Sequence, residues 1–159
     1  MSKSRSQNLK EIKGNWTVAE IEISYKPIIT DRKTITSSSS AYELIKSLWN
    51  TETICLQENF AALFFNTSKK IIGWRILSIG TMNKCIVDIK LLASLALHCM
   101  ATEVMIVHNH PSGNLNPSAC DKDLTQTIKA ALKLIDVNLL DHLIITEEGY
   151  YSFSDEGML

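Results

Sequence analysis

Two histidines stand one residue apart at the end of an apolar run in the second half of the chain. The run reads EVMIV, and His108, Asn109 and His110 follow it directly. Side chains two positions apart in a β-strand project from the same face. We therefore expect His108 and His110 to point the same way, with imidazoles close enough to share one ion. The alternative is that both are hydrogen-bonded polar residues at a strand end, since histidine has many other uses.

A carboxylate that could complete such a site follows after an irregular loop. Zinc takes three or four N, O or S ligands, at about 2.0–2.2 Å for N and O, and a catalytic site keeps one position for water. Asp121 is the natural third donor because it lies one turn into the next expected helix, where the loop PSGNLNP can turn it back. Ser118 and Asp121 also form the S-x-x-D pattern of a capping box, so both could instead hold a helix N-terminus.

A water activated by a metal also needs a base that accepts its proton. Glu58 is the candidate, because it ends the polar stretch TETICLQE and directly precedes the apolar run NFAALFF. An acidic side chain at the mouth of a core strand can face an active site. Position alone does not distinguish Glu58 from Glu52 or Glu103, and a solvated strand end is the alternative.

The N-terminal part of the chain predicts a tail, one strand and one helix. Residues 1–14 are polar and lack periodicity, which predicts a flexible tail. Residues 16–25, WTVAEIEISY, alternate apolar and polar side chains as in a half-buried strand. A loop rich in Ser and Thr follows, and its last serine, Ser40, is expected to cap a helix over residues 41–50, where apolar positions recur at helical spacing.

The remaining segments predict a mixed α/β sandwich around one sheet, in a single domain. Residues 59–66 and 70–80 are apolar and aromatic runs separated by NTSK, which is typical of an antiparallel hairpin. Residues 89–101 are apolar nearly all round and predict a buried helix, and EVMIVHNH predicts a central strand. The last expected elements are an amphipathic helix over residues 118–136, with Leu124, Ile128, Ala131, Leu132 and Ile135 inside, and strands over residues 142–146 and 150–154.

The composition fits one domain with free thiols. The chain has 159 residues, of which 45% are hydrophobic, and this is enough to bury a core. The net charge is −1, from 16 basic and 17 acidic residues, so charge gives no sign of binding to nucleic acid or an anionic membrane. The start of the chain has no apolar run, and no window is apolar enough to span a membrane. The four cysteines form no C-x-x-C pair, which excludes a four-cysteine zinc knuckle. A reducing cytosol with free thiols is the simplest location, so we expect the protein to be cytoplasmic.

The order of the polar residues is more specific than any one of them. It reads H-x-H, seven residues, then S-x-x-D, from His108 to Asp121. This resembles the JAMM metalloprotease signature of the MPN/JAB fold, in which a glutamate precedes H-[S/T]-H, seven residues and S-x-x-D. The segments HNHPSGN, LLDHLIIT and GYYSF are similar to the RadC-like branch of that family. The resemblance covers roughly residues 41–159, as one JAB/MPN domain after the tail and a segment over residues 15–40.

The resemblance implies a fold and a role for each matching residue. The fold would be a mixed sheet sandwiched by helices, of the cytidine deaminase-like type. His108, His110 and Asp121 would bind zinc. Glu58 would act as the general base, and Ser118 would stabilise the tetrahedral oxyanion.

Other positions carry less chemistry. Asp141 and His142 also match the branch, with no chemical role that we can assign, and we expect both to anchor the turn into the penultimate strand. Asn109 stands where the wider signature has Ser or Thr, as is normal for the RadC-like branch. RadC-like proteins also carry an N-terminal helical region resembling helix-hairpin-helix DNA-binding modules. This sequence has a short strand-like segment and a helix in its place, so the DNA-repair label of the family finds little support here.

The leading hypothesis is a JAMM-type metallopeptidase, a zinc-dependent hydrolase of peptide or isopeptide bonds with Zn²⁺ as its cofactor. A zinc deaminase would need H-x-E and C-x-x-C, and the sequence has neither. Two alternatives remain: a RadC-like protein that acts on or binds DNA, inferred through the family resemblance alone, and a non-catalytic MPN interaction module. No membrane partner is expected, and the sequence leaves the oligomeric state open.

Overall fold

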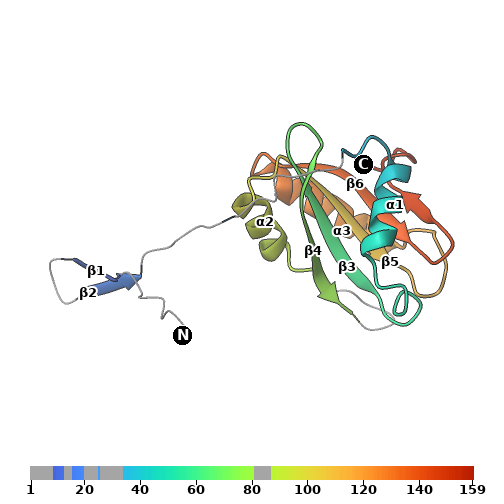
Figure 1. Cartoon of the computed structure of the whole chain (residues 1–159), viewed down its shortest axis with the longest axis horizontal. Coiled ribbons are helices and arrows are strands. Elements are labelled where there is room, and N and C mark those ends of the chain that lie inside the picture. Colours follow the sequence, from blue (N-terminus) through green and yellow to red (C-terminus); the bar gives the residue numbers. More distant parts are fainter. Residues whose placement is uncertain (1–8, 13–15, 20–24, 26–33, 81–86) are drawn as a thin grey trace.

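A computed structural model of the chain describes residues 9–12, 16–19, 25, 34–80 and 87–159. The two longest ranges form a five-stranded sheet with helices on both faces (Figure 1). This arrangement confirms the α/β sandwich expected from the sequence. No helix in the described ranges is both long enough and apolar enough to cross a bilayer.

The sheet is mixed, and its strand order is β4-β3-β5-β6-β7. Strands β5 and β6 run parallel, whereas all the other neighbours are antiparallel. A parallel pair needs a crossover, and helix α3 (Ala119–Lys133) supplies it between these two strands. The bounds are β3 Asn59–Phe65, β4 Ile71–Ile79, β5 Glu103–Asn109, β6 Asn138–Ile145 and β7 Tyr150–Ser152.

Each face of the sheet has its own hydrophobic core. Successive side chains of a strand point to opposite faces, so Leu63 and Val107 pack with α1, whereas Phe64 and Ile106 pack with α2 and α3. All of β3 is buried, as expected for a strand covered on both faces (Figure 1). The helices are α1 Ser38–Leu48, α2 Ile89–His98 and α3 Ala119–Lys133.

Two expectations about the strands are confirmed. The segments around NTSK form the antiparallel hairpin β3–β4, with Leu63 opposite Trp74. Strand β5 lies in the middle of the sheet between β3 and β6. Its C-terminal end therefore delivers the H-x-H pair to the centre of one sheet edge, where neighbouring strands can contribute further side chains.

The N-terminal segment differs from the expectation. Leu9–Ile12 forms β1, which pairs antiparallel with β2, Trp16–Ala19. The sequence predicted no strand within residues 1–14, and β1 differs from that expectation because a hairpin is held by backbone hydrogen bonds that need no apolar periodicity. The strand predicted over residues 16–25 is confirmed as far as Ala19. Residues 1–8, 13–15 and 20–24 lie outside the described residues.

Helix α1 begins earlier than expected, because Ser37 and not Ser40 is its N-cap. The Ser37 hydroxyl accepts from the Ser40 N–H at 3.1 Å, and the Ser40 hydroxyl accepts from the Ser37 N–H at 3.1 Å. This capping box satisfies two backbone donors. A run of four serines offers several caps, and the reciprocal pair is selected because a cap at Ser40 alone would satisfy fewer of these donors.

Helix α2 is less buried than expected. Leu92 and Ala96 are fully buried, but Leu91 is 39% exposed and Leu97 is 51% exposed. The prediction of a buried helix is wrong because only one face of α2 packs on the sheet, while apolar side chains on another face remain in contact with solvent.

The C-terminal elements follow the expected pattern with different ends. Helix α3 covers Ala119–Lys133, and Ile128 and Leu132 on its inner face are fully buried. Strand β6 starts at Asn138, before the expected residue 142, because its first residues also pair with β5. Strand β7 stops at Ser152, before the expected residue 154.

A buried carboxylate on β6 explains the end of β7. Asp141 is 3% exposed, and its Oδ1 accepts the N–H groups of His142 at 2.7 Å and Ser154 at 2.9 Å. Its Oδ2 accepts the Ser152 hydroxyl at 2.6 Å. Burial raises the pKa of Asp141, and these hydrogen bonds oppose the increase. Asp141 therefore anchors the segment after β7, and not the turn into β6 as expected.

Replacing Asp141 by alanine is expected to lower the free energy of unfolding by about 2–4 kcal/mol, because buried N–H donors lose their acceptor. Urea denaturation followed by circular dichroism measures the change. Asp123→Ala, at an exposed position on α3, is the control and should change stability by less than about 0.5 kcal/mol. Equal effects of the two substitutions would contradict the anchoring role.

Candidate metal centre

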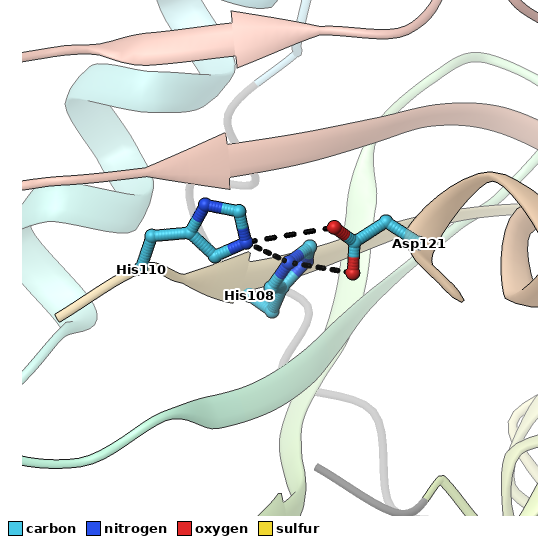
Figure 2. A group of neighbouring side chains, drawn as sticks. All are labelled: His108, His110 and Asp121. Carbon is cyan, nitrogen blue, oxygen red and sulfur yellow. Dashed lines mark hydrogen bonds and ion pairs between the residues drawn. The ribbon is translucent and has the colours of Figure 1, made fainter. Parts of the chain in front are cut away.

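Side chains from two elements converge beside the C-terminal end of β5. His108 lies in β5, His110 lies just beyond it, and Asp121 lies in the first turn of α3. Figure 2 shows the Asp121 carboxylate facing both imidazoles. The two Nε2 atoms are 3.0 Å apart, and the Asp121 oxygens lie 3.3 Å from Nε2 of His108 and 3.6 Å from Nε2 of His110. One atom from each residue lies within 4.8 Å of the others, so the sequence prediction that these three residues meet is confirmed.

The loop after β5 fixes the position of His110. Its backbone N–H donates to the carbonyl of Ile145 at 3.0 Å, which extends the pairing with β6 by one residue. Its carbonyl accepts the N–H of Gly113 at 3.1 Å, closing a turn. Gly113 has a φ of +77°, a conformation that favours glycine. The PSG motif therefore reverses the chain directly beside the histidine pair.

The capping box of α3 orients the carboxylate. The Ser118 N–H donates to Oδ2 of Asp121 at 2.7 Å, and the Ser118 hydroxyl accepts the Asp121 N–H at 3.1 Å. Oδ2 is thereby held by the helix start, while Oδ1 faces His108. The two interpretations of S-x-x-D, a helix cap and a ligand, are compatible because Oδ1 takes no part in the cap, and Oδ2, which does, still lies 3.6 Å from Nε2 of His110.

The donor set fits a divalent cation such as zinc. Nδ1 of His110 lies 2.6 Å from the Asn114 carbonyl, which can only accept, so Nδ1 carries the hydrogen and Nε2 can present a lone pair. Unprotonated, the two Nε2 atoms and the Asp121 oxygens are all acceptors. Acceptors at these distances repel one another unless a proton or a cation lies between them. Two imidazoles and one carboxylate are ligands that zinc uses, with a coordination position left for water.

The charges of the cluster are strongly coupled. Burial alone would raise the pKa of Asp121, but hydrogen bonds with His108 and His110 outweigh it and hold this pKa well below its usual range. The hydrogen bond to Asp121 is also the main reason that the pKa of His110 is raised, against the effect of burial. Asp121 is therefore an anion that attracts positive charge to the two Nε2 atoms.

Glu58 is close enough to this cluster to interact with its charges. Burial raises the pKa of Glu58, charges on His108 and His110 lower it, and the charge on Asp121 raises it further. The side chain is half-buried directly before β3.

The structure distinguishes Glu58 from Glu52 and Glu103, which sequence position alone could not exclude as the candidate base. Glu103 is the first residue of β5, whereas His108 lies near the last, so the two are at different ends of that strand. Glu52 is exposed in the turn after α1. Glu58 instead lies where the charges of the two histidines and the aspartate act on its carboxyl group and shift its pKa.

Asn109, between the two histidines, ties the Glu58 segment to β5. Its Oδ1 accepts the Asn59 N–H at 2.8 Å, and its Nδ2 donates to the carbonyls of Ile54 at 2.6 Å and Gln57 at 2.9 Å. The side chain is fully buried, so these bonds are shielded from water. Because the backbones of both neighbours of Glu58 are bonded to the Asn109 side chain, the residue between the two histidines fixes the backbone position from which the Glu58 side chain extends.

Ser118 is exposed and adjoins the cluster through its bonds to Asp121. Its hydroxyl oxygen accepts the cap hydrogen bond, so the hydroxyl hydrogen is free to point elsewhere.

His142 was expected to anchor a turn, but its imidazole contacts His108. Nε2 of His142 lies 2.8 Å from Nδ1 of His108, and Thr125 of α3 contacts the other ring nitrogen. Burial is the main cause that lowers the pKa of His142 well below its ordinary value. The available sequence signal was a histidine inside the apolar run LLDHLIIT. Its partner depended on the parallel register of β5 and β6, which the sequence does not specify.

The chain belongs to the RadC-like JAB domain family, whose model matches residues 35–158. The match begins before residue 41, where the domain was expected to start, and includes the cap of α1. The chain is similar to a UPF0758 protein of Flavobacterium johnsoniae, with 41% identity over 96% of this chain and 66% of that protein. A UPF0758 protein of Porphyromonas gingivalis is 40% identical over 80% of this chain and 56% of the relative. The chain thus spans about two thirds or less of the length of these relatives.

Replacing Asn109 by alanine is expected to loosen the segment before β3. Three hydrogen bonds are lost and buried backbone groups remain unpaired, which lowers the free energy of unfolding by about 2–4 kcal/mol. Amide hydrogen exchange at Asn59 should accelerate by more than the exchange in α3. Asn138→Ala, at an exposed position, is the control. Unchanged exchange at Asn59 in the Asn109 variant would show that the tie does not hold the segment.

Proposed function

We propose that this chain is a zinc-dependent hydrolase of amide or isopeptide bonds. The observation that carries the proposal is the convergence of His108, His110 and Asp121 within 4.8 Å. Glu58, whose pKa responds to these three residues, supplies an acidic group beside them. Membership of the RadC-like JAB domain family supports the same chemistry.

The three ligands would hold the cation through Nε2 of each histidine and Oδ1 of Asp121. Zinc bound there would polarise the scissile carbonyl and lower the pKa of a water. The cap bond to Oδ2 keeps the carboxylate oriented, and the Asn114 carbonyl keeps the His110 ring oriented. The protein thereby holds the donors in place before the cation arrives.

Glu58 would act as the general base. It would accept a proton from the attacking water and later pass it to the leaving amine. A carboxylate in bulk water is a weak base at neutral pH, but burial raises the pKa of Glu58 and makes its carboxylate a better proton acceptor. The Asn109 hydrogen bonds hold the backbone on both sides of this residue.

Ser118 would stabilise the oxyanion. Its hydroxyl oxygen is engaged by the helix cap, which leaves its hydrogen available as a donor. Contacts of this kind are worth about 2.7–4 kcal/mol, judged by the removal of oxyanion-hole donors in other enzymes. The cap and the catalytic role use different parts of the same hydroxyl group.

Removal of one ligand histidine is expected to abolish zinc binding. Protein purified without chelator should contain about one zinc per chain by elemental analysis, as three protein ligands and a water would give. His110→Ala should lose it. His98→Ala, which changes an exposed histidine of α2, is the matched control and should keep it. Wild-type protein that neither contains zinc nor gains thermal stability from added zinc would overturn the proposed site.

Glu58→Gln is expected to lose turnover and keep zinc. Loss of a general base costs about 10²–10⁴-fold in rate, measured as cleavage of a peptide library and of an isopeptide-linked substrate. Glu52→Gln, at an exposed glutamate, should retain full activity. Cleavage that survives in the Glu58 variant would rule out this residue as the base. Wild-type protein that binds zinc but cleaves neither substrate would favour the non-catalytic interaction module.

A further inference from the structure

A buried chain of hydrogen bonds lies behind the candidate metal centre. His142 of β6 contacts His108 of β5 through Nε2 and Nδ1, at 2.8 Å. Nδ1 of His142 lies 2.6 Å from the hydroxyl of Thr125, and that hydroxyl lies 2.5 Å from the backbone carbonyl of Asp121. The side chains of His142 and Thr125 are fully buried. This series of hydrogen bonds, called the relay below, therefore joins the His108 side chain to the backbone of Asp121 without passing through solvent.

The direction of these hydrogen bonds follows from their last member. The Asp121 carbonyl can only accept, so the contact at 2.5 Å requires the Thr125 hydroxyl to donate to it. A hydroxyl has one hydrogen. Its oxygen must then accept in the second contact, and Nδ1 of His142 is the donor. The reverse assignment would leave two oxygens facing each other at 2.5 Å with no hydrogen between them.

The same reasoning sets the tautomer of His108. The His142 ring is fully buried and stacks on Phe153, with the ring centroids 4.7 Å apart, so a cationic imidazole is disfavoured. With its hydrogen on Nδ1, the neutral ring has a lone pair on Nε2. The contact at 2.8 Å then requires Nδ1 of His108 to donate, which leaves Nε2 of His108 to face Asp121.

We propose that His142 and Thr125 are positioning residues that fix the tautomer of His108 in the form that can bind a cation. A ligand histidine usually donates its other ring N–H to a carboxylate, a carbonyl or a water. A carboxylate or a carbonyl can only accept, but an imidazole can accept or donate. Thr125 is therefore needed to decide whether Nε2 of His142 accepts or donates in its hydrogen bond with His108. The consequence for zinc affinity rests on the proposed function, whereas the tautomer itself is a property of the metal-free protein.

The relay also constrains the geometry of the ligands. It connects β5, β6 and α3 and returns to the residue that supplies the carboxylate. Phe60 stacks on His108 with the ring centroids 6.0 Å apart and the planes 13° from parallel, which limits rotation of the ligand ring. Rotation of His108 would break its bond to His142, so the two contacts fix both the ring plane and the location of its hydrogen.

Thr125→Val tests the relay with little change in shape. Valine removes the hydroxyl, so Nδ1 of His142 loses its acceptor and the preference for one tautomer disappears. Thr127→Val is the matched control, since Thr127 makes the same intrahelical bond, to the Asp123 carbonyl at 2.8 Å, but is exposed. His142→Leu removes the relay, and His142→Gln keeps an acceptor and a donor at one side chain and should rescue part of the effect.

The first readout is the nitrogen spectrum of the metal-free protein with ¹⁵N-labelled histidine. The chain has four histidines, so long-range ¹H–¹⁵N correlations can be assigned by single substitutions. We expect a hydrogen on Nδ1 and none on Nε2 of His142, and a hydrogen on Nδ1 of His108 whether or not Nε2 also binds a proton. In Thr125→Val the His142 signals should shift toward a mixture of tautomers, whereas Thr127→Val should match wild type. A hydrogen on Nε2 of wild-type His142 would overturn the proposal.

The second readout is zinc affinity, measured by competition with a fluorescent chelator. We expect His142→Leu to weaken zinc binding about 10–100-fold, as the loss of such partners does elsewhere. Thr125→Val should weaken it less, and Thr127→Val should leave it unchanged. Wild-type affinity in both His142→Leu and Thr125→Val would overturn the proposal while the zinc site stands. The expected tautomers in a protein that binds no zinc would overturn the proposed function and leave the relay supported.

Discussion

The site depends on holding three electron-rich groups against one another. The ring nitrogens of His108 and His110 approach to 3.0 Å, and both face the Asp121 carboxylate. Lone pairs at this distance repel, so the arrangement is favourable only with positive charge between them. The fold must supply the geometry before that charge is present. It does so by placing each donor on an element whose backbone is already fixed by hydrogen bonds.

The chain achieves this by giving the same groups structural and chemical roles at once. Oδ2 of Asp121 completes the helix cap and also lies near His110, while Oδ1 faces His108. Asn109 lies between the two histidines, and both the oxygen and the nitrogen of its side-chain amide hold the segment that carries Glu58. Fixing these side chains costs little additional conformational entropy, because the backbone contacts that position them are also needed for folding.

Much of the site could be predicted from the sequence because its key spacings are local. The alternation of a strand places His108 and His110 together, and S-x-x-D places Asp121 at a helix start. Sequence position could not distinguish Glu58 from Glu103 as the acidic residue of the site. The difference depends on which of them lies near the C-terminal end of β5, where the histidines are. The contact between His108 and His142 spans 34 residues and depends on the register of a parallel pair. Backbone pairing, which leaves no apolar pattern, also explains why strand β1 was not expected.

Strand β5 serves both faces of the sheet with consecutive residues. His108 faces the side of α3, while Asn109 faces the opposite side, where it meets the carbonyl of Ile54. Insertion or deletion of one residue within the strand would exchange these sides, so that the amide would meet the carboxylate and a histidine would meet the backbone of the Glu58 segment. The strand can therefore accept replacement of its apolar residues by others of similar volume, but not a change of length. We therefore expect a change in the number of residues to be tolerated only in the connections on either side of it.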